Sequence, residues 1–122
     1  MATEDYSRIQ ALLVNDKPHL LSNLTAAMFA DRLGWEPERL TAALRYGGGV
    51  SFFDAINAAR VREVQQLARR PANVRISLLV LAHEAEFGSK SAFYDAFRRH
   101  AGCPPAEWRR RQVHEKASEA FG

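Results

Sequence analysis

The sequence predicts an all-α protein of about seven helices, on three observations. Apolar residues recur at three- and four-residue steps along most of the 122 residues, which is the spacing of one helix face. Serine, threonine and proline stand where these stretches begin, and glycine stands where several of them end. No stretch alternates apolar and polar residues as a half-buried strand does. A chain of this length suits one compact domain or two very small ones.

Four helices are predicted in the first half of the chain, at about residues 6–15, 25–33, 37–46 and 51–69. Thr25 and Ser51 can cap two of them, because a hydroxyl oxygen accepts from a free backbone N–H in the first turn. Pro37 opens the third, since proline suits the first helical position. Gly34 and the glycines at 47–49 end the second and third helices.

Three more helices are predicted after a break at residues 71–73, at about 77–85, 89–100 and 106–113. Ser77 caps the first of these, and either Ser89 or Ser91 starts the second. Trp108 in the last is expected to anchor the core, with the three arginines at 109–111 solvated or facing phosphate. The predicted division is 1–69 (N-terminal helix, first subdomain and linker helix), 70–113 (second subdomain) and 114–122 (a frayed tail).

The two halves of the chain repeat each other. A shift of 52 residues, which becomes 53 after the turn, pairs residues of the same kind: Thr25 with Ser77, Ala30 with Ala82, Trp35 with Phe87, Leu44 with Phe97, and Gly49 with Gly102. Two amphipathic stretches pair some apolar positions by chance. The matched caps, aromatics and terminal glycines together favour a true structural duplication.

Each copy reads as a helix, a short turn and a second helix, which is the helix-turn-helix pattern. The second helix of such a motif can enter the major groove of DNA. A single copy is equally consistent with a helical hairpin that only packs. Two copies joined by a helix of about 18 residues favour the paired motif, because that helix spans about 27 Å, near the about 34 Å of one DNA turn.

The net charge of +3 is unevenly distributed. Residues 36–75 carry seven basic side chains against four acidic ones, and residues 89–112 carry six against two. The intervening stretch is acidic. Two basic blocks can each face a polyanion, although an ordinary solvated surface shows similar variation.

From about Leu24 to Arg110 the sequence resembles the paired helix-turn-helix DNA-binding domain of AraC/XylS-type transcription regulators. The strings that carry the resemblance are residues 49–57 (GVSFFDAIN) with Arg60-Val61, residues 84–93 (EAEFGSKSAF), and residues 96–109 (AFRRHAGCPPAEWR). The resemblance implies a bacterial, cytoplasmic, sequence-specific regulator that binds double-stranded DNA. It also implies that the helices from Pro37 and Ser89 each enter a major groove.

The resemblance places two sets of residues toward DNA. Base-reading positions are Glu38, Thr41, Ala42, Lys90, Ser91 and Asp95. Phosphate contacts are assigned to Arg39, Arg45, Ser89, Tyr94, Arg98 and Arg99. Lys90 can donate to guanine O6 and N7, whereas arginines on phosphate position the protein without reading sequence.

The sequence departs from the family pattern at several of these positions. Glu38 and Asp95 stand where relatives often have arginine or glutamine. Glu86 replaces the usual glycine of the second turn, and Pro104 replaces a Ser or Thr cap. Glutamate at a turn that needs positive φ costs about 1–2 kcal/mol. These acidic residues motivate an alternative function, a degenerate helix-turn-helix domain that acts as a protein–protein interaction module.

Other kinds of site find little support. The string His83-Glu84-Ala85-Glu86-Phe87 lacks the second histidine of a zinc-protease motif. The lone thiol, Cys103, and four scattered histidines predict no metal site. No catalytic triad or carboxylate pair can be assembled, so neither an enzyme nor a cofactor is expected.

Double-stranded DNA is the predicted partner, RNA polymerase is a candidate protein partner, and no membrane contact by this chain itself is expected. Relatives usually carry an additional sensory or dimerisation region. The chain is therefore expected to be either a C-terminal domain of a sensor-linked regulator, in which that region is membrane-embedded, or a short regulator. The target sequence, effector, oligomeric state and sign of regulation cannot be inferred from the sequence.

Overall fold

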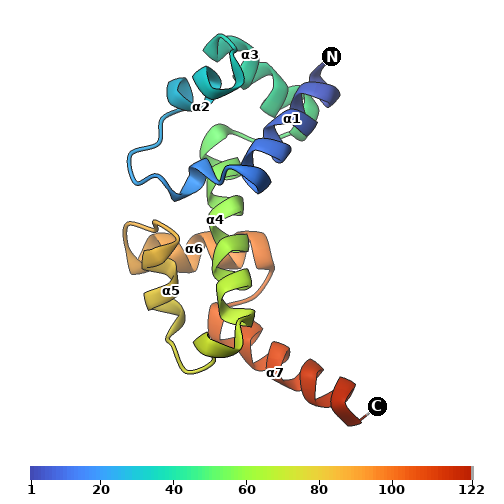
Figure 1. Ribbon diagram of the computed structural model, residues 1–122, viewed down its shortest axis with the longest axis vertical. Helices are drawn as coiled ribbons and strands as arrows, with labels where there is room; N and C mark the ends of the chain where they lie inside the picture. Colours follow the sequence, from blue (N-terminus) through green and yellow to red (C-terminus); the bar gives the residue numbers. More distant parts are fainter. Residues whose placement is uncertain (122) are drawn as a thin grey trace. The chain divides into compact units, whose positions relative to one another are not determined.

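The computed structural model describes residues 1–121, with side chains up to Val113. Within these residues the chain forms seven α-helices and no strand, which confirms the all-α prediction. The helices are α1 (Ala2–Asn15), α2 (Ala26–Leu33), α3 (Pro37–Ala42), α4 (Phe52–Arg69), α5 (Leu78–Glu84), α6 (Lys90–Ala101) and α7 (Pro105–Phe121), labelled in Figure 1. Two short 3-10 turns (Pro18–Leu20 and Pro71–Asn73) and a π-helix (η2, Ala43–Gly48) complete the described secondary structure.

The chain divides into two compact units. Unit 1 is Met1–Ala59 and unit 2 is Arg60–Gly122, and the boundary falls inside α4. The sequence analysis placed its division at the end of the same helix, after residue 69. Each unit has its own buried core, so each is described separately.

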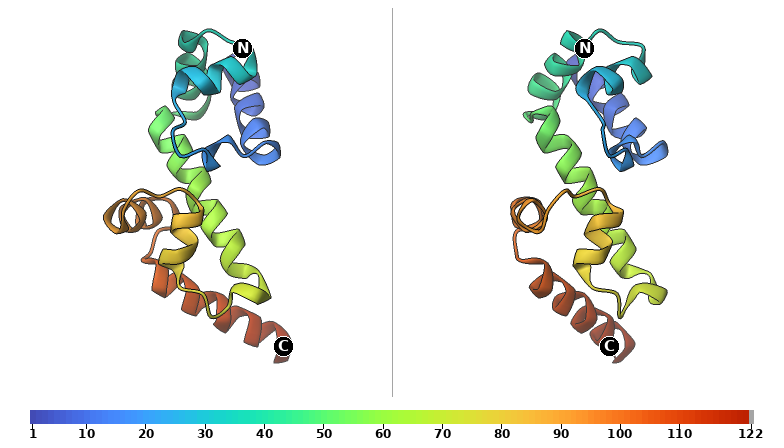
Figure 2. Two further views of the ribbon diagram at one scale, coloured as in Figure 1. Left: turned by 60° about the vertical axis from the view of Figure 1, so that its left-hand side comes forward. Right: turned by 90° about the vertical axis from the view of Figure 1, so that its left-hand side faces the viewer.

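In unit 1 the helical segments α1, α2, α3 and η2 lie together (Figure 2), and they share one apolar cluster. The residues at three- and four-residue spacing supply it: Ile9, Leu13, Phe29, Ala30, Trp35, Leu40, Ala43, Leu44, Ala55, Ile56 and Ala59. The Phe29 ring meets the Phe52 ring edge-on, with centroids 5.7 Å apart, which is a favourable aromatic arrangement. The last three members come from α4, which fixes its first half to this unit.

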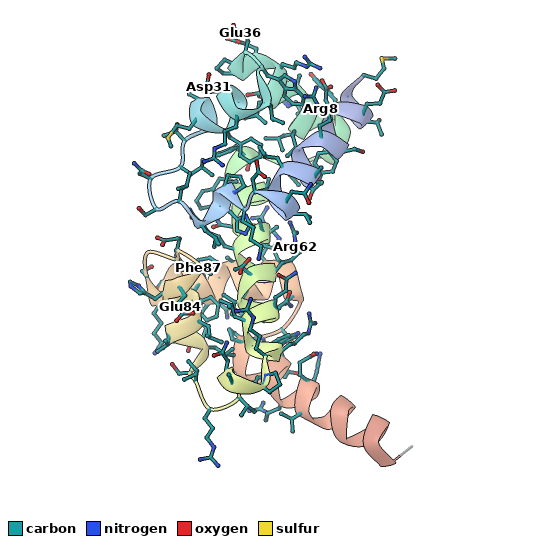
Figure 3. All side chains as sticks on the ribbon, in the orientation of Figure 1. Arg8, Asp31, Glu36, Arg62, Glu84 and Phe87 are labelled. Carbon is teal, nitrogen blue, oxygen red and sulfur yellow. The ribbon has the colours of Figure 1, made fainter. Side chains whose placement is uncertain are left out.

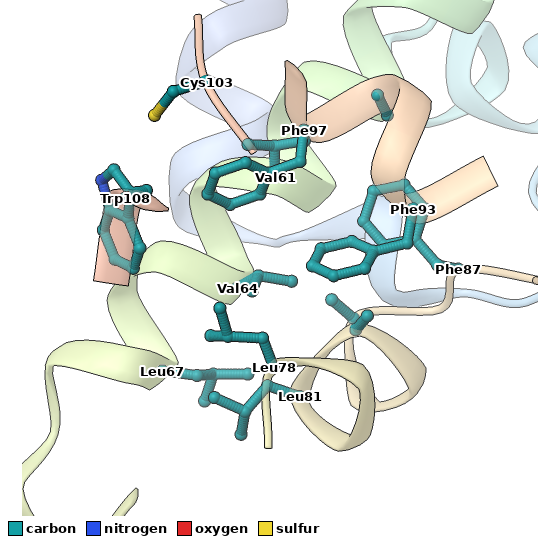
Figure 4. Packing of buried hydrophobic residues seen from close by; sticks show 13 residues of the cluster. Val61, Val64, Leu67, Leu78, Leu81, Phe87, Phe93, Phe97, Cys103 and Trp108 are labelled. Atoms are coloured by element: carbon teal, nitrogen blue, oxygen red, sulfur yellow. The ribbon is translucent and has the colours of Figure 1, made fainter. Parts of the chain in front are cut away.

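Unit 2 has a core rich in aromatic residues (Figure 4). Phe93 lies at its centre, fully buried, with the Phe87 ring at 5.3 Å and the Phe97 ring at 5.7 Å. Trp108 meets Phe97 edge-on at 5.7 Å and is 7% exposed. The prediction that Trp108 anchors the core is therefore confirmed. Val61 and Val64 of α4 belong to the same cluster.

Side-chain caps begin four of the helices as the sequence predicts. The hydroxyl oxygens of Thr25, Ser51, Ser77 and Ser89 each accept from the backbone N–H three residues later, at 3.1 or 3.2 Å. Of the two candidate starts for α6, the cap is Ser89 and not Ser91. These bonds satisfy amide groups that lack a partner within the helix.

Three helices differ from the sequence prediction, and the first of them, α1, begins at Ala2 and not near residue 6. The helix from Pro37 is α-helical only to Ala42 and then widens into η2. Here Gly47 and Gly48 lie against α1 so closely that a Cβ on Gly48 would enter the Tyr6 ring. The last helix continues past Val113 to Phe121, because no proline or glycine interrupts it. The tail predicted at 114–122 lies outside the residues whose side chains the structure describes.

Candidate nucleic-acid interface

The two helix-turn-helix copies have the same turn geometry. The N–H of Trp35 donates to the carbonyl of Ala30 at 2.9 Å, and the N–H of Phe87 donates to that of Ala82 at 3.0 Å. The residue before each aromatic is left-handed, with φ of 73° at Gly34 and 71° at Glu86. The positive φ that the sequence analysis considered for Glu86 is therefore present. This shared bonding supports the duplication that the sequence predicts.

The second helix of each copy buries one side and exposes the other. Leu40, Ala43 and Leu44 are buried in unit 1, and their counterparts Phe93, Ala96 and Phe97 are buried in unit 2. Both sets occupy the same helical positions when one copy is shifted onto the other. The opposite faces of α3 and α6 are therefore available to a partner.

The predicted base-reading residues of the first copy lie on this outer face. Glu38 and Thr41 are exposed and Ala42 is half-buried. The Thr41 hydroxyl donates to the carbonyl of Pro37 at 3.2 Å, which leaves its oxygen able to accept. Arg45 is exposed one turn further along, in η2. These positions recur at i, i+3, i+4 and i+7, which is the spacing of one helix face.

The predicted DNA-facing residues of the second copy lie on α6. Lys90, Ser91 and Asp95 are exposed, and the Lys90 ammonium lies 5.5 Å from the ring centroid of half-buried Tyr94. Arg98 and Arg99 are also exposed. Figure 3 labels Phe87, which lies in the turn that precedes this helix.

The carboxylate of Asp95, one of the predicted base-reading residues of α6, is paired. Arg98 donates to Asp95 at 3.1 Å, with both side chains largely exposed. An exposed pair of this kind stabilises the helix by a small amount. The arrangement neutralises a negative charge that would otherwise repel phosphate. Asp95, predicted to read bases, and Arg98, predicted to contact phosphate, are thus in direct contact.

Arg39 has a different environment from the other predicted phosphate contacts. Its guanidinium donates two hydrogen bonds of 2.9 Å to the carboxylate of Asp5 in α1. These bonds lower the pKa of Asp5 below its ordinary value and raise that of Arg39. The sequence analysis did not identify Asp5, since it precedes Arg39 by 34 residues and belongs to no motif.

Each unit has a hollow beside its predicted DNA-facing helix. The hollow in unit 1 measures about 430 Å³ and is lined by Thr41, Arg45 and Ser51 among others. The hollow in unit 2 measures about 520 Å³, and Tyr94 and Arg110 belong to its lining. The two occupy equivalent positions in the repeat, because Thr41 corresponds to Tyr94.

One arginine near the second hollow is half-buried and bonds to backbone carbonyl groups. The guanidinium of Arg109 donates to the carbonyl oxygens of Asn73, at 2.7 Å, and Ile76. Asn73 in turn donates to the carbonyl of Leu67 at 2.8 Å. The loop between α4 and α5 places these carbonyl groups next to α7. Arg109 therefore holds this loop, a role that the sequence analysis did not predict.

Among the residues that the structure describes, no group of three His, Cys, Asp or Glu side chains is arranged to hold a metal ion. In the same part of the chain, no helix combines the length and apolar character needed to cross a membrane.

Comparison with known proteins identifies the family. A family model described as a helix-turn-helix domain matches residues 29–111, which is more than half of the chain. No curated protein sequence matches the chain. A solved structure of a protein of unknown function from Listeria innocua has the same fold, with a TM-score of 0.61 and 21% identity over 84% of this chain and 94% of the other. The chain therefore belongs to the AraC-type helix-turn-helix family of DNA-binding domains.

Proposed function

We propose that this protein is a sequence-specific transcription regulator, or the DNA-binding domain of one, whose α3 and α6 enter two major grooves of double-stranded DNA. The observation that carries the proposal is the pair of turns with identical bonding, each followed by a helix with one buried and one exposed face. Two such motifs in one chain can recognise a bipartite site without a second protomer.

Side-chain chemistry supports different roles along the two helices. Lys90 can donate to guanine, and Ser91 can pair with either type of base edge. Glu38 can accept from the amino group of cytosine. Arg45 and Arg99 are exposed cations suited to phosphate, which fixes the register of the protein on DNA. Under this proposal the protein acts in the cytoplasm, and RNA polymerase is a candidate partner.

Selection of bound duplexes from a random pool tests the proposal. The selected duplex is then titrated with the protein at several salt concentrations, with a scrambled duplex as the control. We expect the affinity to fall as salt rises, with a log–log slope of about −0.9 for each phosphate neutralised. The selected duplex should bind more tightly than the scrambled one at every salt concentration.

Two results would count against the proposal in different ways. Equal affinity for selected and scrambled duplexes would show DNA binding without sequence recognition. Absence of binding to any duplex at low salt would reject DNA binding by the isolated chain and leave protein–protein interaction as the function to test.

A further inference from the structure

The N-terminal helix α1 is joined to the start of α3 by a bidentate ion pair between Asp5 and Arg39. Nε and Nη2 of Arg39 donate to Oδ2 and Oδ1 of Asp5, both at 2.9 Å. The Asp5 side chain is 15% exposed and that of Arg39 is 49% exposed. Two parallel bonds fix the orientation of the guanidinium as well as its position.

The same guanidinium lies on an aromatic ring. Its central carbon is 4.4 Å from the centroid of Trp35, the buried aromatic of the first turn. Arg8 of α1 lies 5.1 Å from the same ring; Figure 3 labels Arg8 on α1. The contacts of Arg39 with Asp5 and with Trp35 together tie α1, the turn and α3 into one assembly.

A second contact joins α1 to the other end of the same helical segment. Gly47 and Gly48 of η2 meet Ala2 and Tyr6 at a distance that leaves no room for a Cβ. α1 therefore holds the segment from Pro37 to Gly48 near its start, through Arg39, and at its end, through the two glycines. Two separated points of attachment restrict rotation of this segment about its own axis.

Rotation matters because base reading depends on which residues face the groove. Neighbouring residues of an α-helix are about 100° apart around the axis, so a modest rotation changes the direction of Glu38 and Thr41. In unit 2 the position equivalent to Arg39 is Ala92, which cannot form such a tie. The attachment is thus a property of the first copy.

We infer that Arg39 is a positioning residue and not a phosphate contact, and that Asp5 and Arg39 together set the orientation in which α3 meets DNA. This inference rests on the proposed function. It extends the DNA-reading unit to α1, all of which precedes the matched helix-turn-helix region.

The test compares Asp5→Asn, Arg39→Gln and the double variant with wild type. Arg45→Gln is the matched control, because it removes the same charge from an exposed position further along the same segment. Fluorescence anisotropy gives the Kd for the selected and scrambled duplexes over a series of salt concentrations. Amide hydrogen exchange of the free protein measures the local stability of α1 and α3.

We expect Asp5→Asn and Arg39→Gln each to raise the Kd for the selected duplex by about two- to fivefold, with no further rise in the double variant. The salt slope should stay unchanged in both, and the Kd for the scrambled duplex should not rise in Asp5→Asn. Arg45→Gln should instead reduce the salt slope by about 0.9 and weaken both duplexes. Asp5→Asn is the most informative variant, because removing a negative charge would by itself favour DNA binding.

An unchanged or lowered Kd for Asp5→Asn would overturn the inference, as would a reduced salt slope for Arg39→Gln. If wild type binds no duplex, the proposed function fails, and hydrogen exchange decides whether the pair orders α3. Faster exchange in α1 and α3 of both variants, with unit 2 unchanged, supports the pairing; unchanged exchange rejects it.

Discussion

Replacing Glu86 by glycine is expected to stabilise unit 2. Glu86 has a φ of 71° in the turn between α5 and α6, a conformation in which a side chain is strained. The equivalent residue of the first copy is Gly34, with a φ of 73°. The two turns make the same backbone bonds, so the substitution gives the second turn the residue that the first already has.

The magnitude follows from three contributions. Relief of left-handed strain contributes about 1–2 kcal/mol to the free energy of unfolding. Glycine offsets about 0.4–1 kcal/mol of this stabilisation, because it makes the unfolded chain more flexible. The substitution also removes the attraction between Glu86 and Arg60, whose pKa is lowered by burial and partly raised by the Glu86 charge. A net gain of up to about 1 kcal/mol is expected.

Gly34→Ala is the matched opposite change. A Cβ at Gly34 would have no atom within 4 Å, so the variant adds left-handed strain without a clash. It should destabilise unit 1 by about 0.5–1.5 kcal/mol. Glu86→Ala keeps the strain and removes only the charge, so it measures the contribution of Arg60 and should not stabilise unit 2.

Urea unfolding followed by amide hydrogen exchange checks these values, because exchange resolves unit 1 from unit 2. Each kcal/mol should also move the melting temperature of a unit of this size by about 4–8 °C. The reasoning would be refuted if Glu86→Gly lowered the stability of unit 2, or if Glu86→Ala stabilised it as much as glycine does.

Three further predictions concern the core, the base contacts and pH. Leu44→Ala and Phe97→Ala, which remove equivalent buried side chains, should each cost about 2–5 kcal/mol by urea unfolding; a smaller loss would show that the core collapses around them. Lys90→Ala should reduce discrimination at one base position by about 1–3 kcal/mol, whereas Arg98→Ala should weaken all duplexes alike; similar profiles in a binding selection would contradict a base-reading role. Because Arg39 lowers the pKa of Asp5 below 3.8, the stability that Asp5 adds is present above that pH and lost as pH falls below it. The difference in stability between wild type and Asp5→Asn should therefore shrink on acidification below about pH 4, and a constant difference would show that the ion pair does not cause it.

The outer faces of α3 and α6 could be predicted from the sequence because helical periodicity is local. Once Leu40 and Leu44 are buried, the geometry of the helix places Thr41 and Arg45 on other sides of it. The repeat then transfers the same reasoning to Phe93 and Tyr94 in the second copy. Which of these side chains contact bases is a property of the complex with DNA and stays a prediction.

The roles of two arginines could not be predicted in this way. Arg39 appears in sequence as an exposed cation on a recognition helix, and Arg109 appears as one of three consecutive arginines. Their partners are Asp5, 34 residues earlier, and the carbonyl oxygens of Asn73 and Ile76, at least 33 residues earlier. A charge pattern shows that a cation is present but does not show which distant acceptor it meets.

The sequence by itself determined which helix faces are buried and where the capped helices begin, since caps and apolar spacing act over three or four residues. It also determined the repeat, which pairs Glu86 with Gly34, whereas the positive φ of Glu86 is a finding of the structure. Only the tertiary structure decided that the helix from Pro37 widens at Ala43 and that α1 holds it at both ends. These features depend on the packing of segments that lie far apart in the chain. Their contacts are set by the way the segments fit together and not by local helix propensity.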